Sequence, residues 1–305
     1  GDFFGEYPDE VREKYLLTLG DGRYALRDEY KTQRLVVDYF AGQKKNDKNK
    51  RICDGLLGLI DQVLFIEDPV EKGKYHPRIS AQFTYTYRTL NDYERWCFDR
   101  LYNDFFYRRH NDFWYGKAMW KLPPLIDSTD MLVCAEDLGM IPACVPAVIN
   151  RLEILSLEIQ RMPKDPNVEF GNTWSYPYYS VCTTSTHDMG GIRQWWEEDR
   201  AKTQRFYNEV LHLGGEAPVY AEPWICDRII DLHLKSPSML CILPLQDWLS
   251  TNGAIRRKDP REEQINVPAN SRHYWRYRMH LTIEELLADK AFAGYLKSKI
   301  EQDGR

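Results

Sequence analysis

Two charged pairs in this sequence stand directly after short runs of apolar and small residues. Glu136 and Asp137 follow residues 131–135, and His187 and Asp188 end a second run of this kind. Each run has the composition of a buried strand. Because the carboxyl ends of parallel strands meet at one edge of a sheet, the side chains that follow such strands often form an active site. A carboxyl group from each of two strand ends suits the breaking and forming of glycosidic bonds.

The apolar pattern around these pairs predicts the elements that position them. Four runs have the length and composition of strands, near 131–135, 157–161, 181–186 and 239–245. Patterns at helical spacing separate them, and a polar, aromatic loop over 162–179 is long enough to carry function. This alternation predicts an α/β fold, the C-terminal half of a (β/α)8 barrel of the TIM type with helical insertions.

The first part of the chain differs from the rest in its predicted secondary structure. Residues 1–128 are rich in helical patterns, including a helix expected from Asn91, and we assign them to a helical subdomain. Residues 129–305 contain the four expected strands and a closing helix, which starts at a capping box formed by Thr282 and Glu285. No internal repeat or low-complexity segment divides either part.

Composition and charge argue against several classes of function. The formal net charge of −5 and a pI near 5.9 do not suit a nucleic-acid-binding surface. No apolar stretch is long enough to span a membrane, and the start, Gly-Asp-Phe-Phe-Gly-Glu, lacks the features of a signal peptide. The seven cysteines form no paired pattern and fit reduced thiols, so we expect a cytoplasmic protein. Cys134 and Cys182 fall within expected strands and are interpreted as core residues. No spacing typical of a metal site is present, and no metal is expected.

Five motifs, in a fixed order along the chain, resemble the 4-α-glucanotransferase (amylomaltase) family. They are CAEDLGMIPACV, EIQRMP, TSTHD with IRQWWEED, LPLQDWL, and INVP with YWRYR. The resemblance runs from about Arg51 to about Tyr277 and is greatest to the large disproportionating-enzyme branch of plants and some bacteria. It implies transfer of glucosyl or maltooligosaccharyl units between α-1,4-glucans by a retaining, covalent glycosyl-enzyme mechanism. It also implies that no metal or organic cofactor is needed.

The same resemblance implies roles for particular residues. Glu136 corresponds to the general acid/base, and Asp188 to the carboxylate that stabilises the transition state and holds sugar hydroxyls. A general acid must keep its proton near neutral pH, so Glu136 is expected where burial or a neighbouring negative charge favours its protonated form. His187 resembles a hydroxyl-binding residue. Three further residues resemble substrate-loop positions of the family, namely Gln246, Asp247 and Asn266.

Several of these residues also have a structural interpretation. An acidic residue after a strand often caps the next helix, which applies to Asp137 and to Asp188. Arg161 stands at the end of its strand as a substrate-binding candidate, and an ion pair within the fold is an equal alternative. Trp174, in the long loop, is the candidate sugar platform, whereas the two tryptophans at 195–196 suit the packing face of a helix.

The nucleophile of the family is absent from this sequence. The family carries it as the Asp of an Arg-(Ile/Val)-Asp-His motif upstream of EDLG, and no such motif occurs here. A similar stretch, 35–40, contains Asp38 without the arginine and the histidine, and its helical pattern makes Asp38 solvated helix surface. We therefore expect a C-terminal fragment of a 4-α-glucanotransferase with little or no activity by itself.

Two other functions remain open on the sequence. A chain that kept the cleft and lost the nucleophile would be a non-catalytic α-glucan-binding protein. An ordinary α-amylase-like hydrolase is the weaker alternative, because the motif order and the aromatic loop argue against it. In each case a half barrel exposes strand edges and apolar helix faces. We expect such a chain to dimerise through those surfaces or to be marginally stable, with α-1,4-glucans or maltooligosaccharides as partners and no nucleic-acid or membrane partner.

Overall fold

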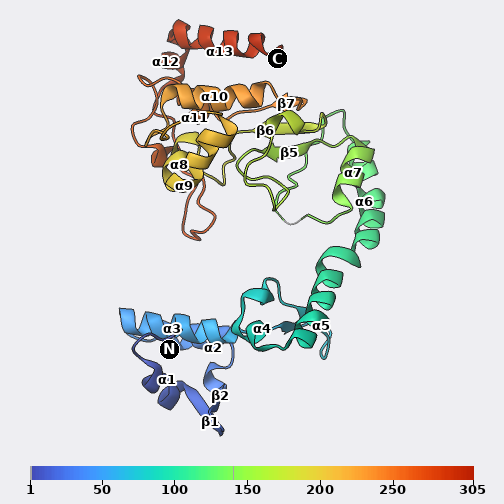
Figure 1. Cartoon of the computed structure of the whole chain (residues 1–305), viewed down its shortest axis with the longest axis vertical. Helices are drawn as coiled ribbons and strands as arrows, with labels where there is room; N and C mark the ends of the chain where they lie inside the picture. Colours follow the sequence, from blue (N-terminus) through green and yellow to red (C-terminus); the bar gives the residue numbers. More distant parts are fainter. Residues whose placement is uncertain (1, 140) are drawn as a thin grey trace. The chain divides into compact units, whose positions relative to one another are not determined.

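The computed structural model describes residues 2–139 and 141–305, and the chain divides into two compact units (Figure 1). The first unit ends at His110 and the second begins at Asn111, ahead of the division expected after residue 128. The reason lies in helix α6 (Asn111–Ile126), whose Asn111 Oδ1 accepts a hydrogen bond from the Cys144 backbone amide at 3.3 Å. In the described part of the chain, the helices are too short or too polar to cross a bilayer.

The first unit begins with a hairpin next to a helix. Helix α1 (Pro8–Tyr15) leads into strands β1 (Leu16–Gly20) and β2 (Arg23–Leu26), which pair in antiparallel fashion. The loop between the strands has positive φ at Asp21 (51°) and Gly22 (71°), the geometry that Asp-Gly hairpins adopt. We did not predict this hairpin from the sequence, although its Asp-Gly signal is present there.

Two further helices complete the core of this region. They are α2 (Gln33–Ala41) and α3 (Asp47–Ile60), each opened by a side chain that accepts a hydrogen bond from the first turn, Thr32 on α2 and Asn46 on α3. Asp38 lies on α2 and is exposed, as the sequence predicted. The core residues that these elements bury are Phe4, Val11, Tyr15, Tyr30, Val36, Ile52 and Leu56.

The rest of the first unit is a short hairpin followed by helices. Strands β3 (Phe65–Glu67) and β4 (Tyr75–Pro77) are antiparallel. The short helices η2 (Ala81–Phe83) and α4 (Tyr85–Thr89) then lead to α5 (Asp92–Asn103). Asn91 and Glu94 form a complete capping box at the start of α5, which confirms the helix expected from Asn91. The helix continues as a π-helical segment, η3, over Asp104–Arg108.

The second unit contains a small parallel sheet. Strands β5 (Ser156–Ile159), β6 (Ser180–Thr183) and β7 (Leu240–Cys241) lie in that order, and a bridge between Cys134 and Leu155 adds a further parallel segment beside β5. Helix α7 (Val145–Leu152) connects the bridged segment to β5.

The sheet agrees with the expected strands in order and direction, but the strands are shorter. The run 131–135 contributes only the bridge at Cys134, and the run 239–245 contributes only the two residues of β7. The described residues form helices and a parallel sheet and no closed barrel. Since no strand among the described residues pairs with the other side of the bridged segment, Cys134 is exposed, and its interpretation as a core residue is wrong. Cys182, within the sheet, is buried as predicted.

Helices pack around this sheet and bury its largest core. They are α8 (Ile192–Glu198), α9 (Arg200–Arg205) with the π-helical segment η5 (Phe206–Val210), α10 (Pro223–Leu234) and α11 (Leu245–Leu249). Trp196 is fully buried in the cluster and Trp195 is 8% exposed, which confirms both as packing residues.

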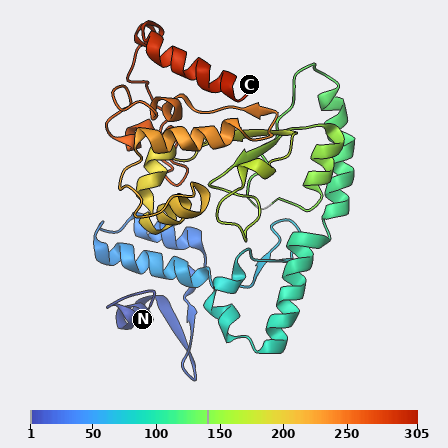
Figure 2. The ribbon, with the colours of Figure 1, turned by 45° about the horizontal axis from the view of Figure 1, so that its top comes forward.

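The chain closes with helices α12 (Ile283–Ala288) and α13 (Lys290–Gln302). The expected capping box between Thr282 and Glu285 is present at the start of α12. Helix α13 runs beside α10 (Figure 2), where Lys299 Nζ lies 2.9 Å from Asp227 Oδ1.

Candidate active site

The carboxyl ends of the parallel strands bring most of the predicted residues to one edge of the sheet. Glu136 follows the bridged segment, Arg161 follows β5, Asp188 follows β6, and Gln246 and Asp247 lie in α11 just after β7. Parallel neighbours are about 4.8 Å apart, so the bridged segment and β6, with β5 between them, are separated by roughly 10 Å. We call this edge, with the loops that leave it, the rim.

Asp188 is held at the rim by a residue that is distant in sequence. Its Oδ1 accepts a hydrogen bond from Asn266 Nδ2 at 2.5 Å, and its Oδ2 lies 3.5 Å from His187 Nε2. The Asn266 backbone amide also donates to the His187 carbonyl oxygen at 3.0 Å. The side chain of Asp188 remains 44% exposed, so a ligand can reach its carboxylate.

Asp188 does not cap the helix that follows it. Helix α8 begins at Ile192, and its N-cap residue is Gly191, which has no side chain to offer. Asp247 takes the capping role instead, because its Oδ1 accepts the Ile192 backbone amide at 2.8 Å. The structural interpretation of Asp188 as a helix cap is therefore wrong.

Asp247 was predicted to bind substrate, but its carboxylate is already occupied. It is 2% exposed, and its Oδ2 accepts hydrogen bonds from Thr184 Oγ1 at 2.6 Å and Ser185 Oγ at 2.8 Å. A Cβ on Gly191 would lie 2.7 Å from its other oxygen, so the loop after β6 is packed tightly against it. Asp247 holds that loop in place, and its burial keeps the carboxylate away from any ligand in solvent.

Arg161 lies beneath the same loop. It is 9% exposed, and its guanidinium donates to the carbonyl oxygens of Thr184, at 3.1 and 2.8 Å, and of Gly190, at 2.9 Å. The guanidinium also sits 5.1 Å from the centre of the Trp195 ring. Burial lowers the pKa of Arg161 to about 10. Arg161 therefore supports both ends of the loop that carries Asp188 and does not reach the rim surface. Among the described residues it also forms no salt bridge, which was the structural alternative to substrate binding.

Glu136 and Asp137 have opposite environments. Glu136 is exposed, so the burial expected for it is not found, because its segment lies at the outer side of the sheet. Asp137 is 7% exposed and accepts hydrogen bonds from the Leu157 backbone amide at 2.8 Å and from Lys164 Nζ at 2.7 Å. Asp137 therefore ties its segment to β5 and does not cap a helix.

Two further predicted residues lie at the margins of this arrangement. Trp174 belongs to the single turn η4 (Thr173–Ser175), is 62% exposed, and lines a hollow of about 500 Å³ together with Gln160. Gln246 is half-buried, and its Nε2 lies 3.4 Å from the Glu263 carbonyl oxygen. Among the described residues, neither has a hydrogen bond or ring contact with His187, Asp188 or Asn266.

A buried pair that we did not predict from the sequence supports the loop behind Gln246. Arg193 lies 3.6 Å from Glu263 and donates to the carbonyl oxygens of Arg257, at 2.7 Å, and Lys258, at 3.1 Å. Burial raises the pKa of Glu263 to about 7, and burial also lowers the pKa of Arg193. The sequence contained one indication of this pair, because Arg193 lies in the IRQWWEED motif close to the buried helix face at 195–196.

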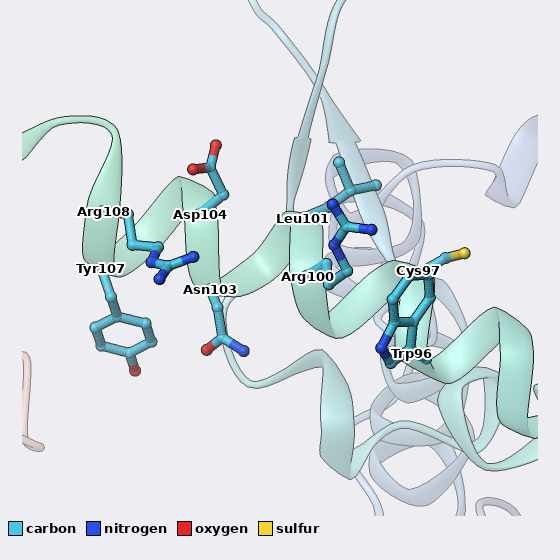
Figure 3. Close-up of a pocket in the computed structure, with 8 residues that line it drawn as sticks. All are labelled: Trp96, Cys97, Arg100, Leu101, Asn103, Asp104, Tyr107 and Arg108. Atoms are coloured by element: carbon cyan, nitrogen blue, oxygen red, sulfur yellow. The ribbon is translucent and has the colours of Figure 1, made fainter.

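Another hollow lies in the first unit and has a different character. Figure 3 shows its lining on α5 and the π-helical segment that follows, around a volume of about 840 Å³. The residues are Trp96, Cys97, Arg100, Leu101, Asn103, Asp104, Tyr107 and Arg108. All of them come from one continuous helical stretch, none follows a strand, and the hollow contains no predicted site residue. Among the described residues, no group of three or more His, Cys, Asp or Glu side chains is placed to hold a metal ion.

Known proteins match this chain over most of its length. The sequence profile of the 4-alpha-glucanotransferase family matches residues 80–282. A rice protein, 4-alpha-glucanotransferase DPE2 of Oryza sativa subsp. japonica, is 35% identical over 306 residues, covering 99% of this chain and 32% of the relative. A 4-alpha-glucanotransferase of Chlamydia pneumoniae is 31% identical over 179 residues, covering 58% of this chain and 34% of the relative.

A solved structure is also similar. Amylomaltase from Streptococcus agalactiae, in complex with acarbose, matches with a TM-score of 0.45 and 17% identity over 58% of this chain and 32% of that chain. The chain thus spans about a third of the length of the relatives that it matches. Because the family profile covers more than half of the chain, the chain belongs to the 4-alpha-glucanotransferase family.

Proposed function

We propose that this chain is part of an enzyme that transfers glucosyl or maltooligosaccharyl units between α-1,4-glucans. The observation that carries the proposal is the rim, where Glu136 and Asp188 follow two parallel strands of one sheet and Asn266 holds Asp188 at 2.5 Å. Membership of the 4-alpha-glucanotransferase family agrees with this chemistry.

Each rim residue has a role in the proposed retaining mechanism. Glu136 protonates the leaving oxygen and later takes a proton from the incoming sugar hydroxyl. Asp188 stabilises the positive charge that develops on the sugar and, with His187 and Asn266, holds its hydroxyl groups. Because Asn266 holds Asp188 by a hydrogen bond and His187 lies 3.5 Å from the same carboxylate before substrate arrives, little reorganisation is required in the transition state.

The buried residues position this group and do not touch the sugar. Asp247 holds the loop over 184–191 from one side, because it accepts hydrogen bonds from two hydroxyl groups of the loop and from the Ile192 amide that follows it. Arg161 holds the loop from the other side by donating to its carbonyl oxygens. Gln246 and Trp174, which lie further from Asp188, suit contacts with outer units of a glucan chain. No cofactor has a role in this proposal.

The nucleophile must come from outside this sequence. A covalent glycosyl-enzyme needs a carboxylate about 5–5.5 Å from the acid/base, and the family motif that supplies it is absent here. The aspartate of the most similar stretch, Asp38, is on the exposed surface of α2 in the first unit. We therefore propose that the 305-residue chain is inactive by itself and that the longer protein of the same reading frame is the active form.

Disproportionation of maltose in the presence of glycogen tests these assignments. In the longer protein, Glu136→Gln is expected to lower kcat by roughly 100- to 10,000-fold, the range typical of a lost general acid, and Asp188→Asn is expected to have an effect of similar size. The matched control is Asp130→Asn, an exposed carboxylate shortly before the same strand segment. Release of glucose by the 305-residue chain at the rate of the longer protein would overturn the assignment of inactivity, and an active Glu136→Gln variant would overturn the role of Glu136.

The absent nucleophile also favours a second candidate, a non-catalytic α-glucan-binding protein derived from this family. The reading frame upstream of the first residue separates the two. An Arg-Ile-Asp-His or Arg-Val-Asp-His motif in frame supports the transferase, and a start codon without such a motif supports the binding protein.

A further inference from the structure

The cluster around Asp188 includes an aromatic side chain with no assigned role. The ring of Trp275 lies 4.9 Å from the ring of His187, centre to centre, with 44° between the two planes. Its contact with His187 places Trp275 beside the group formed by His187, Asp188 and Asn266. We propose that Trp275 is the stacking surface for the glucose unit that Asp188 and His187 hold; this inference rests on the proposed function.

The exposure of these side chains supports a ligand contact. Trp275 is 59% exposed, and the side chains of His187 and Asp188 are 51% and 44% exposed. A large apolar ring left in water is unfavourable, by about 25 cal/mol for each Å². A pyranose ring has an apolar face of C–H groups and an edge of hydroxyl groups, so it matches an indole ring next to a carboxylate and an imidazole. Such a combination of aromatic surface and a few polar groups is typical of small-ligand sites.

The segment that carries Trp275 is anchored on both sides of it. Before it, the Asn266 amide donates to the His187 carbonyl oxygen at 3.0 Å, and His273 Nε2 donates to the Ile265 carbonyl oxygen at 2.8 Å. After it, the Arg278 carbonyl oxygen accepts a hydrogen bond from Arg257 at 2.8 Å. Trp275 is therefore held near Asp188 in the absence of ligand, and stacking of a sugar costs little additional ordering.

The adjacent residue, Tyr274, provides a matched control. It is 68% exposed and stands in the same segment, but the Arg276 guanidinium lies 4.9 Å from the centre of its ring. Among the described residues, Tyr274 forms no hydrogen bond or ring contact with His187, Asp188 or Asn266. Removing either side chain should disturb folding equally little, because both are mostly in water. Only the loss of Trp275 is expected to affect sugar binding.

Isothermal titration of the 305-residue chain with maltoheptaose tests the inference. Trp275→Ala is expected to raise Kd at least 10-fold, Trp275→Phe less than about 3-fold, and Tyr274→Ala less than about 2-fold. Thermal unfolding of each variant separates lost stacking from lost folding, and recovery of binding by Trp275→Phe distinguishes an aromatic contact from a structural role. A Trp275→Ala variant that binds like Tyr274→Ala, while Asp188→Asn binds more weakly, would overturn the role of Trp275 and leave the proposed function in place. A wild-type chain that binds no maltoheptaose would overturn both the stacking role and glucan binding at this rim.

Discussion

At the scale of single residues, the structure separates groups that face solvent at the rim from groups that lie beneath it. Asp188, His187 and Glu136 are open to solvent, whereas Asp247 and Arg161 are buried and fully engaged. All of these residues stand in the motifs that resemble the family, and those motifs do not distinguish between them. Burial and hydrogen bonding separate the residues that a ligand can reach from those that hold the others in position.

Asn266 is expected to matter for activity more than for stability. Asn266→Ala removes the 2.5 Å hydrogen bond to Asp188, so the carboxylate loses its fixed direction. In the longer protein we expect kcat/KM to fall roughly 10- to 100-fold, about 1.4–2.7 kcal/mol of transition-state stabilisation. The free energy of unfolding should change by less than about 1 kcal/mol, because the pair is exposed. Asn270→Ala, in the same loop, is the control, and equal activity of the two variants would contradict the role of Asn266.

Glu263 is expected to make stability depend on pH. Its folded-state pKa of about 7 is above the usual 4.5, so the folded protein binds this proton more tightly than the unfolded chain does. Between pH 4.5 and 7, the contribution of Glu263 to the free energy of unfolding therefore falls as pH rises. The Glu263→Gln variant has no titrating carboxyl group at this position. Its free energy of unfolding relative to that of wild type should therefore increase from pH 4.5 to 7, by on the order of 1–3 kcal/mol.

Urea unfolding at pH 4.5, 6 and 8 measures this difference. Comparison with wild type at each pH cancels the other titrating groups, among them His233, whose pKa burial lowers to about 4. A difference between Glu263→Gln and wild type that does not vary with pH would show that the pKa of Glu263 is not raised in the folded protein.

At the scale of elements, the loop after β6 depends on contacts with segments that come much later in the chain. Its hydroxyl groups and the first amide of α8 all bond to Asp247, which lies in α11 after β7. Its carbonyl oxygens bond to Arg161, which follows β5. Three neighbouring strand ends thus share one buried polar network, and the position of Asp188 depends on that network.

Asp247→Ala is therefore expected to be strongly destabilising. The change leaves three donors without their acceptor, on Thr184, Ser185 and Ile192, two of them on buried side chains. We expect the free energy of unfolding to fall by about 3 kcal/mol or more, measured by urea unfolding. Asp130→Ala, at an exposed position, should change it by less than about 0.5 kcal/mol. A loss for Asp247→Ala as small as that of the control would contradict the network.

At the scale of the whole molecule, the second unit contains a parallel sheet whose two edges have no paired strand in the part of the chain that the structure describes. The bridged segment is at one side and β7 is at the other, and the adjacent residues Leu132 and Ile242 are 52% and 60% exposed. Open strand edges with exposed apolar side chains pair readily with other chains. A closed barrel would cover both sides.

The 305-residue chain is expected to dimerise or to unfold at low denaturant concentration for this reason. If dimers form through the sheet, Leu132→Lys and Ile242→Lys should each shift the population toward monomer, because a charge opposes edge pairing. Light scattering after size-exclusion chromatography measures the mass. Ile283→Lys, which alters an equally exposed residue on α12, should not change it. A thermally robust wild-type monomer would contradict this prediction.

The sequence alone predicted what depends on neighbours along the chain. The helix that starts at Asn91, the capping box at Thr282 and the packing face at 195–196 follow from a few adjacent residues, and the structure contains all three. The order of the strands also followed from the alternating pattern. Local signals of this kind act over one or two turns, so they can be recognised without knowledge of the fold. The Asp-Gly hairpin at 21–22 had such a signal too, and we missed it.

The tertiary structure alone decided the chemistry available to each candidate residue. In the sequence, Asp188 and Asp247 are both acidic residues that follow a strand, but one is open at the rim and the other is buried under three hydrogen bonds. The partners that make this difference, Asn266 for Asp188 and Thr184 for Asp247, are 78 and 63 positions away. Such contacts form only when the strands assemble, because the sheet brings distant strand ends together. The apolar pattern along the chain indicates only which side chains of each segment are buried.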